Sequence, residues 1–142
     1  MSTTGLDAFD STIHKTNVWL NEIMARLDTT DRHLAYHALW AVLHVLRDRL
    51  TVEAAVQFGA QLPMLIRGFY YEGWTPAGKP LKWNKQEFVA CIRDSFRGPS
   101  APDPEKLVRV VFAVLAHHVS EGEVDNVKNI LPKQLRELWP AA

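Results

Sequence analysis

Hydrophobic residues recur every three to four positions along most of this chain, which is the period of an α-helix. In the first long segment they are Phe9, Ile13, Leu20, Ile23, Met24 and Leu27, and they predict an amphipathic helix over residues 10–27 with these side chains on its apolar face. The next segment, residues 31–50, has a similar apolar face that includes Ala35, Leu39, Val42 and Leu46. The pattern therefore predicts an all-α protein without a β-sheet.

Residues that favour helix ends divide the rest of the chain into shorter helices. Short polar side chains that accept a backbone N–H bond are typical just before a helix, and glycine is typical just after one. Start signals occur at Thr51, Leu62-Pro63, Asn84 with Glu87, Asp103-Pro104, Ser120 with Glu123, and Leu131-Pro132, and Gly73 marks an end. Together with the two long segments, these signals predict a single-domain bundle of about eight helices over residues 1–142.

The second half of the chain repeats the pattern of the first at an offset of 69 residues. When residues 39–70 are laid on residues 108–139, helix caps and core positions correspond without a gap, and Leu62-Pro63 aligns with Leu131-Pro132. A repeat at a fixed offset is typical of tandem structural units that bury their apolar faces against each other. The predicted parts are a first helical unit over residues 9–73, a connecting segment over residues 74–83 and a second helical unit over residues 84–140.

Three sequence motifs resemble a known family. They are Leu46-Arg47-Asp48-Arg49-Leu50, the run from Gln61 to Trp74 that begins Gln-Leu-Pro-Met-Leu-Ile-Arg-Gly, and the closing Leu131-Pro132 to Trp139-Pro140. They are similar to the bacterial family called domain of unknown function 2267, and the resemblance extends from about residue 9 to residue 140. It implies a small helical bacterial protein, and the family brings no established reaction, cofactor or catalytic residue.

Composition and charge exclude some classes of function. Lys and Arg number 16, and Asp and Glu also number 16, so no overall field attracts nucleic acid or an anionic membrane. Lys79, Lys82 and Lys85 lie near tryptophans, but these charges are too few to favour nucleic-acid binding. The apolar runs at residues 38–43 and 110–116 are far shorter than a bilayer span, and the N-terminus lacks the pattern of a signal peptide. We expect a cytoplasmic protein that does not enter a membrane.

Candidate metal ligands are few. His33 and His37 are spaced i, i+4, which places both imidazoles on one helix face, and they are the weak metal candidates of the sequence. His44 is two turns further along the helix and too far away to share an ion with them. Because neither a cysteine nor a clear carboxylate partner supplies the remaining ligands of this pair, we interpret this face as polar surface and predict no metal or other cofactor.

No other set of residues forms a recognisable active site. His117 and His118 end a predicted helix, where positive charge complements the helix dipole, but adjacent residues point about 100° apart and are not expected to act together. Cys91 has the spacing of Phe88 and Ile92, which predicts a buried thiol that reacts slowly. The sequence therefore favours a protein that is not an enzyme.

The two units differ in one informative respect. Outward positions of the second unit hold Lys106, Arg109 and Lys133, and the corresponding residues of the first unit are His37, Trp40 and Met64. Tyr71 also points away from the apolar stripe of its helix. Large apolar groups at outward positions indicate either that Trp74 and Trp83 of the connecting segment cover them or that they contact another chain.

Two functional hypotheses follow from this asymmetry. The first is a non-enzymatic interaction module that binds a protein partner, or a second copy of itself as a homodimer, through Trp40, Met64, Tyr71, Trp74 and Trp83. The alternative is a small-molecule-binding protein or uncharacterised enzyme with a pocket between the two units, lined by Tyr70, Tyr71, Trp74 and Trp83. A flat exposed patch would favour the first hypothesis, and a concave pocket with converging polar groups would favour the second.

Overall fold

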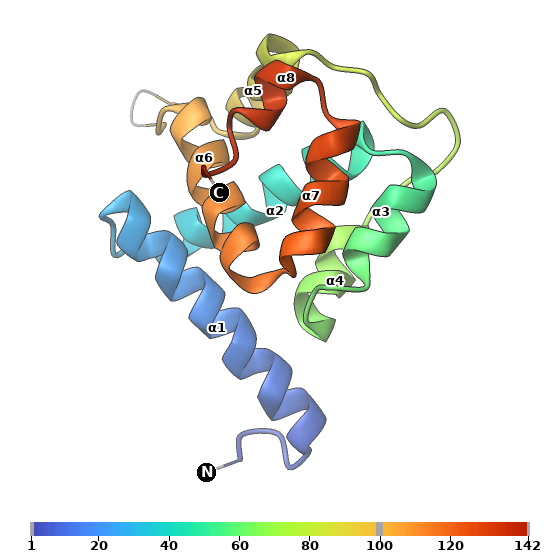
Figure 1. Ribbon diagram of the computed structural model, residues 1–142. Coiled ribbons are helices and arrows are strands. Elements are labelled where there is room, and N and C mark those ends of the chain that lie inside the picture. Colours follow the sequence, from blue (N-terminus) through green and yellow to red (C-terminus); the bar gives the residue numbers. More distant parts are fainter. Residues whose placement is uncertain (1, 99–100, 142) are drawn as a thin grey trace.

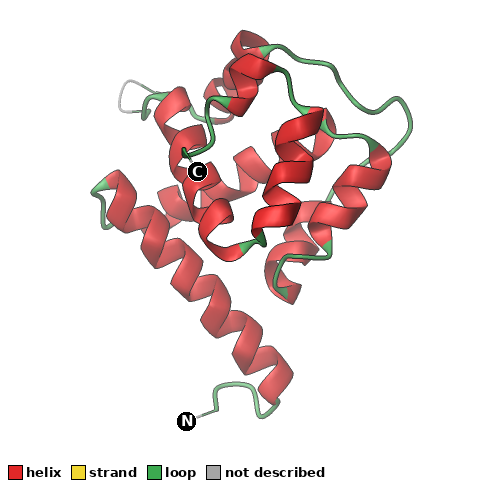
Figure 2. Ribbon diagram, in the orientation of Figure 1, coloured by secondary structure: helices red, strands yellow, loops and turns green. Residues whose placement is uncertain are grey.

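The computed structural model describes residues 2–98 and 101–141, and over these ranges the chain is a single domain of helices without a strand (Figure 2). The prediction of an all-α fold is confirmed. The helices are α1 (Asp7–Leu27), α2 (Arg32–Arg49), α3 (Val52–Gly59), α4 (Met64–Tyr71), α5 (Lys85–Ser95), α6 (Pro104–His118), α7 (Glu121–Ile130) and α8 (Lys133–Arg136). Within the described part of the chain, none of them combines the length and the apolar character that a membrane crossing requires.

Helices α2 and α6 form the centre of the molecule. They pack against each other, α1 packs across both, and α5 packs against the same two helices (Figure 1). Their inward side chains are fully buried, among them Leu39, Leu43 and Leu46 of α2 and Phe112 and Leu115 of α6. The N-terminal half of α1 extends beyond this core, where α4 is the helix nearest to it (Figure 1).

Most of the predicted helix ends are confirmed by their hydrogen bonds. Thr51 accepts from the N–H of Ala54 at 3.2 Å, and Asn84 and Glu87 form the reciprocal pair of bonds that defines a capping box. Gly73 follows α4 with a φ of 75°, a left-handed conformation in which glycine is unstrained. These ends could be predicted because each cap involves residues only a few positions apart.

At the start of α7, the hydrogen bonds differ in one respect from those expected for the Ser120 and Glu123 start signal. Ser120 accepts from the N–H of Glu123 at 3.2 Å as predicted, but its own N–H points to Oε1 of Gln61 at 3.5 Å. Gln61 therefore takes the place that the Glu123 side chain has in a full capping box. The start of the second unit's short helix is in this way tied to the loop before α4.

The helix bounds follow the offset of the sequence repeat. Helices α2 and α6 end at Arg49 and His118, α3 and α7 begin at Val52 and Glu121, and α4 and α8 begin at Met64 and Lys133. The correspondence is not complete, because α4 has 8 residues and α8 has only 4. That the two segments superpose as one motif stays a prediction.

The charged residues at the end of α2 hold the neighbouring segments in place. Arg47 is only 4% exposed, and its Nη1 donates to the carbonyl oxygens of Tyr70 at 2.8 Å and Glu72 at 3.0 Å. Nε of Arg49 donates to the carbonyl oxygen of Trp83 at 2.9 Å. The first motif that resembles the family therefore fixes the end of α4 and the connecting segment.

The prediction that Cys91 is buried is wrong. Helix α5 packs through Phe88 and Ile92, which are fully buried one turn apart, and Cys91 lies beside this line and is only partly buried. The partial burial still raises the pKa of the Cys91 thiol, since it disfavours the thiolate.

Candidate functional site

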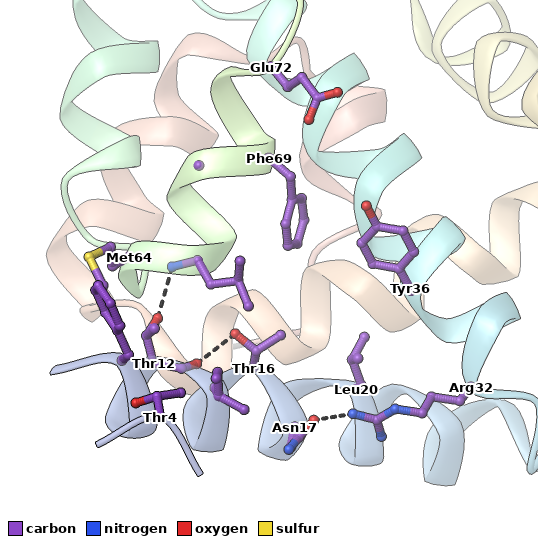
Figure 3. Close-up of a pocket in the computed structure, with 14 residues that line it drawn as sticks. Thr4, Thr12, Thr16, Asn17, Leu20, Arg32, Tyr36, Met64, Phe69 and Glu72 are labelled. Carbon is purple, nitrogen blue, oxygen red and sulfur yellow. Dashed lines mark hydrogen bonds between the residues drawn. The ribbon is translucent and has the colours of Figure 1, made fainter. Parts of the chain in front are cut away.

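An open groove of about 860 Å³ lies between α1, α2 and α4. Figure 3 shows it from the side, with α4 and α2 as two walls and α1 as the third. Most of its surface is apolar, and we call it the apolar groove. The large apolar side chains that line it are Phe9, Ile13, Leu20, Tyr36, Met64, Leu65 and Phe69.

The groove exists because small residues stand where α1 faces α4. Thr12 and Thr16 are the buried side chains of the N-terminal half of α1, and they fill far less space than the Trp19, Leu20 and Ile23 that follow. Oγ1 of Thr12 accepts a hydrogen bond from the N–H of Leu65 at 2.8 Å (Figure 3). This N–H belongs to the first turn of α4, which has no side-chain cap of its own.

Phe9 and Ile13 belong to the predicted apolar face of α1, but the other helices leave them exposed. Phe9 is 47% exposed and Ile13 is 38% exposed, because this part of α1 extends beyond the core and Thr12 and Thr16 take the inward direction. Tyr36 is 43%, Met64 46% and Leu65 44% exposed. Five large apolar side chains from three helices therefore border one groove and remain accessible.

Two aromatic rings close the floor of the groove between α2 and α4. The rings of Tyr36 and Phe69 meet edge to face, with centroids 5.4 Å apart and planes at 79°. Phe69 is 8% exposed, and the carbonyl oxygen of its own residue accepts from Nε2 of His44 at 2.6 Å. Burial lowers the pKa of His44, which keeps this imidazole neutral.

The charged groups are confined to the rim of the groove. Nη2 of Arg32 donates to Oδ1 of Asn17 where α1 and α2 approach each other. Glu72 stands at a separate corner, beyond Phe69 at the end of α4 (Figure 3). The groove thus has an apolar interior and one charge of each sign at different ends.

Of the five residues predicted to form the interaction surface, Met64 lines the apolar groove. The partly buried ring of Trp40 lies on the side of α2 between His37 and His44, with centroid distances of 6.2 Å and 4.1 Å. Trp40 therefore contacts residues of its own helix and is not among the residues that border the groove.

Tyr71 and Trp74 are brought together at the other end of α4. Their ring centroids lie 5.5 Å apart, and the hydroxyl of Tyr71 donates to the carbonyl oxygen of Val56 at 3.3 Å. The connecting segment therefore packs on Tyr71 through Trp74. Trp83 is partly buried and holds Arg49 through its carbonyl oxygen. The predicted surface is divided into separate parts of the molecule.

The weak metal candidates His33 and His37 do not gain a third ligand among the residues that the structure describes. The ring of His37 stacks on Phe96 at 4.2 Å, while His33 is exposed. Three other residues do converge. Nδ1 of His117 and Nε2 of His118 lie 2.8 Å and 3.1 Å from the same oxygen, Oε1 of Glu22. Sequence spacing could not reveal this group, because Glu22 and His117 are 95 positions apart.

The fold and the groove define a small all-helical protein whose main surface feature is an apolar groove formed by three helices. The chain belongs to the DUF2267 family, which is described as an uncharacterized conserved protein, and the family model matches residues 16–138. The predicted family is confirmed. The match includes Tyr36, Met64, Leu65 and Phe69, but it begins after Phe9 and Ile13. A comparison with curated proteins gives no match.

Proposed function

We propose that this protein is a non-enzymatic helical interaction module, and that its apolar groove binds a second copy of the chain. The observation that carries the proposal is the exposure of Phe9, Ile13, Tyr36, Met64 and Leu65 around one groove. Covering apolar surface gains about 25 cal/mol per Å², so a partner that covers several such side chains gains several kcal/mol. A bacterial source and a cytoplasmic location stay predictions.

The N-terminal half of α1 has the pattern of a groove-binding helix. Leu6, the residue just before the helix, and Phe9 and Ile13 within it are 54%, 47% and 38% exposed, and they are spaced i, i+3 and i+7. This is the spacing by which an amphipathic helix places apolar anchors into a groove. The same helix forms one wall of the apolar groove. A single face of the chain therefore offers both a ridge, formed by Leu6, Phe9 and Ile13, and the apolar groove.

A face with both features can pair with itself about a two-fold axis, in which each copy supplies the same patch. In such a pair the ridge of α1 enters the groove of the other copy, and the reverse contact forms at the same time. The axis also exchanges the ends of the groove. Arg32 of one copy then approaches the end of the other copy that holds Glu72, so the charges at the rim are complementary.

A small apolar molecule is the second candidate for the groove. The volume of about 860 Å³ falls within the range of small-molecule sites, which are mostly apolar with a few polar groups at the edge. This candidate requires the chain to remain monomeric with the groove accessible. It is therefore separated from the first by the solution mass.

The test is the molecular mass in solution, measured by sedimentation equilibrium over a wide range of protein concentrations. The chain has a mass of 16.1 kDa, and we expect the mass to rise toward twice this value as the concentration increases. The double variant Ile13→Glu, Met64→Lys places charges in the groove and should remain at the monomer mass. The Lys at position 64 copies Lys133 of the second unit.

A matched control carries the same two kinds of charge outside the groove. Val56 and Leu81 are 48% and 36% exposed and do not line it, so the double variant Val56→Glu, Leu81→Lys should associate like the parent. A parent that stays monomeric at millimolar concentration would contradict the proposal. In that case, saturable binding of a long-chain fatty acid by the parent but not by the groove variant would establish the second candidate.

A further inference from the structure

We propose that Glu22, His117 and His118 form a binding site for a divalent transition-metal ion of the zinc type. The site is independent of the apolar groove, because it lies where the C-terminal half of α1 meets the end of α6 (Figure 1). Two imidazoles and one carboxylate are a donor set that Zn²⁺ uses in proteins, with a water as the fourth ligand.

The spacing of the donor atoms suits one ion. Oε1 of Glu22 lies 2.8 Å from Nδ1 of His117 and 3.1 Å from Nε2 of His118, and one ligand atom from each residue can be chosen with all three within 4.8 Å of one another. Metal–ligand bonds of about 2.0–2.1 Å in a tetrahedron place neighbouring ligand atoms about 3.3 Å apart. Small side-chain rotations bring the three atoms to that separation.

Adjacent histidines can share an ion here because they use different nitrogens. The side chains of His117 and His118 leave α6 in directions about 100° apart. His117 presents Nδ1, which is close to its backbone, and His118 presents Nε2 at the far edge of its ring. The two nitrogens therefore reach one point on α1 although the two side chains diverge.

A second observation indicates that the Glu22 carboxylate can accept a further ligand. Its other carboxylate oxygen, Oε2, is buried and has no hydrogen-bond partner in the described part of the chain. It forms an ion pair with Nε of Arg26 at 3.7 Å, which is beyond hydrogen-bond distance. A buried acceptor without a partner is rare, and a metal ion bound to this carboxylate would account for it.

The surroundings of the three residues also favour a bound cation. His117 and His118 occupy the last turn of α6, where the helix dipole attracts positive charge. The ring of Trp19 stacks on His118 with centroids 4.9 Å apart and planes at 18°, which restrains this imidazole. His117 is 63% exposed on its side chain, so a water has access to the fourth coordination position.

Binding of the ion requires only a change in which ring nitrogen of each histidine carries the proton, and no further reactant. In the hydrogen-bonded arrangement the protons on Nδ1 of His117 and Nε2 of His118 point to Oε1 of Glu22. The ion needs the lone pairs of these two nitrogens, so each neutral ring carries its proton on the other nitrogen when the ion is bound. Each ring thus breaks one N–H bond and forms another by proton exchange with water, so no net proton is released when the metal–ligand bonds form.

The experiment uses the full chain without a histidine tag, stripped of metal with a chelator and titrated with ZnCl₂ in a calorimeter. We expect one Zn²⁺ per chain and intense visible absorption bands when Co²⁺ replaces it, since these bands mark tetrahedral coordination. His117→Asn is the decisive variant, because its exposed side chain can be changed without disturbing the core. It should weaken Zn²⁺ binding about tenfold or more, and Glu22→Gln and His118→Asn should do the same.

His33→Asn serves as the matched control, since His33 is also an exposed helical histidine, and its affinity for Zn²⁺ should equal that of the parent. A measurement on the parent alone gives independent evidence. In long-range ¹H–¹⁵N spectra, Zn²⁺ should shift the ring nitrogens of His117 and His118 and those of no other histidine, because the proton of each of these rings moves to the nitrogen that does not bind the ion. The proposal is overturned if Zn²⁺ fails to bind at about 0.1 mM, or if binding survives in His117→Asn.

Discussion

Oγ1 of Thr12 accepts a hydrogen bond from the backbone N–H of Leu65 at 2.8 Å, although 53 positions separate the two residues. The first turn of a helix has N–H groups without partners inside the helix, and Pro63 before α4 supplies no side-chain cap. A threonine of α1 therefore caps α4 from outside. The same bond fixes the two helices that form opposite walls of the apolar groove.

This relationship gives the first prediction. Thr12→Val keeps the shape of the side chain but removes the acceptor, and the N–H of Leu65 is then left without its partner. We expect the free energy of unfolding, measured with urea, to fall by about 1 kcal/mol, the usual cost of losing a helix cap. Hydrogen exchange of the Leu65 amide should accelerate by a larger factor than that of amides in the core.

Thr16→Val is the matched control for this prediction. Thr16 is buried like Thr12, but its hydroxyl donates to the carbonyl oxygen of Thr12 within the same helix at 2.8 Å. Its loss leaves α4 capped, so exchange at Leu65 should not change. Equal acceleration of the Leu65 amide in both variants would show that the bond from Thr12 does not hold α4.

The second prediction concerns the pH dependence of stability. Burial lowers the pKa of His44, and nearby Arg47 acts in the same direction, while the bond to Phe69 and the charges of Asp48 and Glu72 oppose the shift. An imidazole with a lowered pKa takes up a proton more readily in the unfolded chain than in the folded one. The contribution of His44 is therefore present above the ordinary histidine pKa of about 6.5 and is lost as the pH falls below that value.

The variant His44→Gln isolates this contribution, because the glutamine amide donates to the same carbonyl but does not titrate. Urea unfolding at pH 7.5 and pH 5 should show the parent losing stability relative to His44→Gln on acidification. If the difference between the two proteins is the same at both pH values, the imidazole does not titrate differently in the folded chain.

The helix bounds and the central core could be predicted because their signals are local. Thr51, Asn84 and Gly73 cap helices within a few residues, and the apolar face of α2 around Leu39 and Leu46 is buried as its spacing indicates. The periodicity of apolar residues identifies the apolar stripe of a helix. It does not show how much of that stripe is covered by the neighbouring helices.

The apolar groove and the cluster of Glu22 with the two histidines could therefore be predicted only in part from the sequence. Phe9 and Ile13 continue the stripe of α1, yet they are exposed because the core ends before that part of the helix is covered. Met64 was identified by comparison with Lys133 of the second unit, and this comparison has no counterpart for residues near the N-terminus. The approach of Glu22 to His117 depends on how α1 crosses α6, which no spacing within one helix encodes.

The third prediction tests the close approach of α3 and α4. A Cβ at Gly59 would collide with the hydroxyl of Tyr71, whose ring packs against this part of α3. Gly59→Ala should therefore destabilise the fold by about 1–3 kcal/mol, as overpacking does. In the double variant Gly59→Ala, Tyr71→Ala the closer of the two contacts is removed and only the ring of Tyr70 remains nearby, so the free energies of unfolding should be non-additive by about 1 kcal/mol or more. Additive effects would mean that Tyr71 moves aside freely.

The last prediction concerns Arg47, whose buried guanidinium donates to the carbonyl oxygens of Tyr70 and Glu72. Lysine keeps the charge, but one ammonium on a flexible stem cannot reproduce the fixed fork of an arginine. Arg47→Lys should lower the free energy of unfolding by about 1–3 kcal/mol, because a buried carbonyl or part of the buried charge is left without a partner. Arg26→Lys, at a side chain that is 46% exposed, should change it by less than about 0.5 kcal/mol. If both lysine variants are as stable as the parent, then the positive charge that lysine retains, and not the geometry of the Arg47 guanidinium, holds the end of α4.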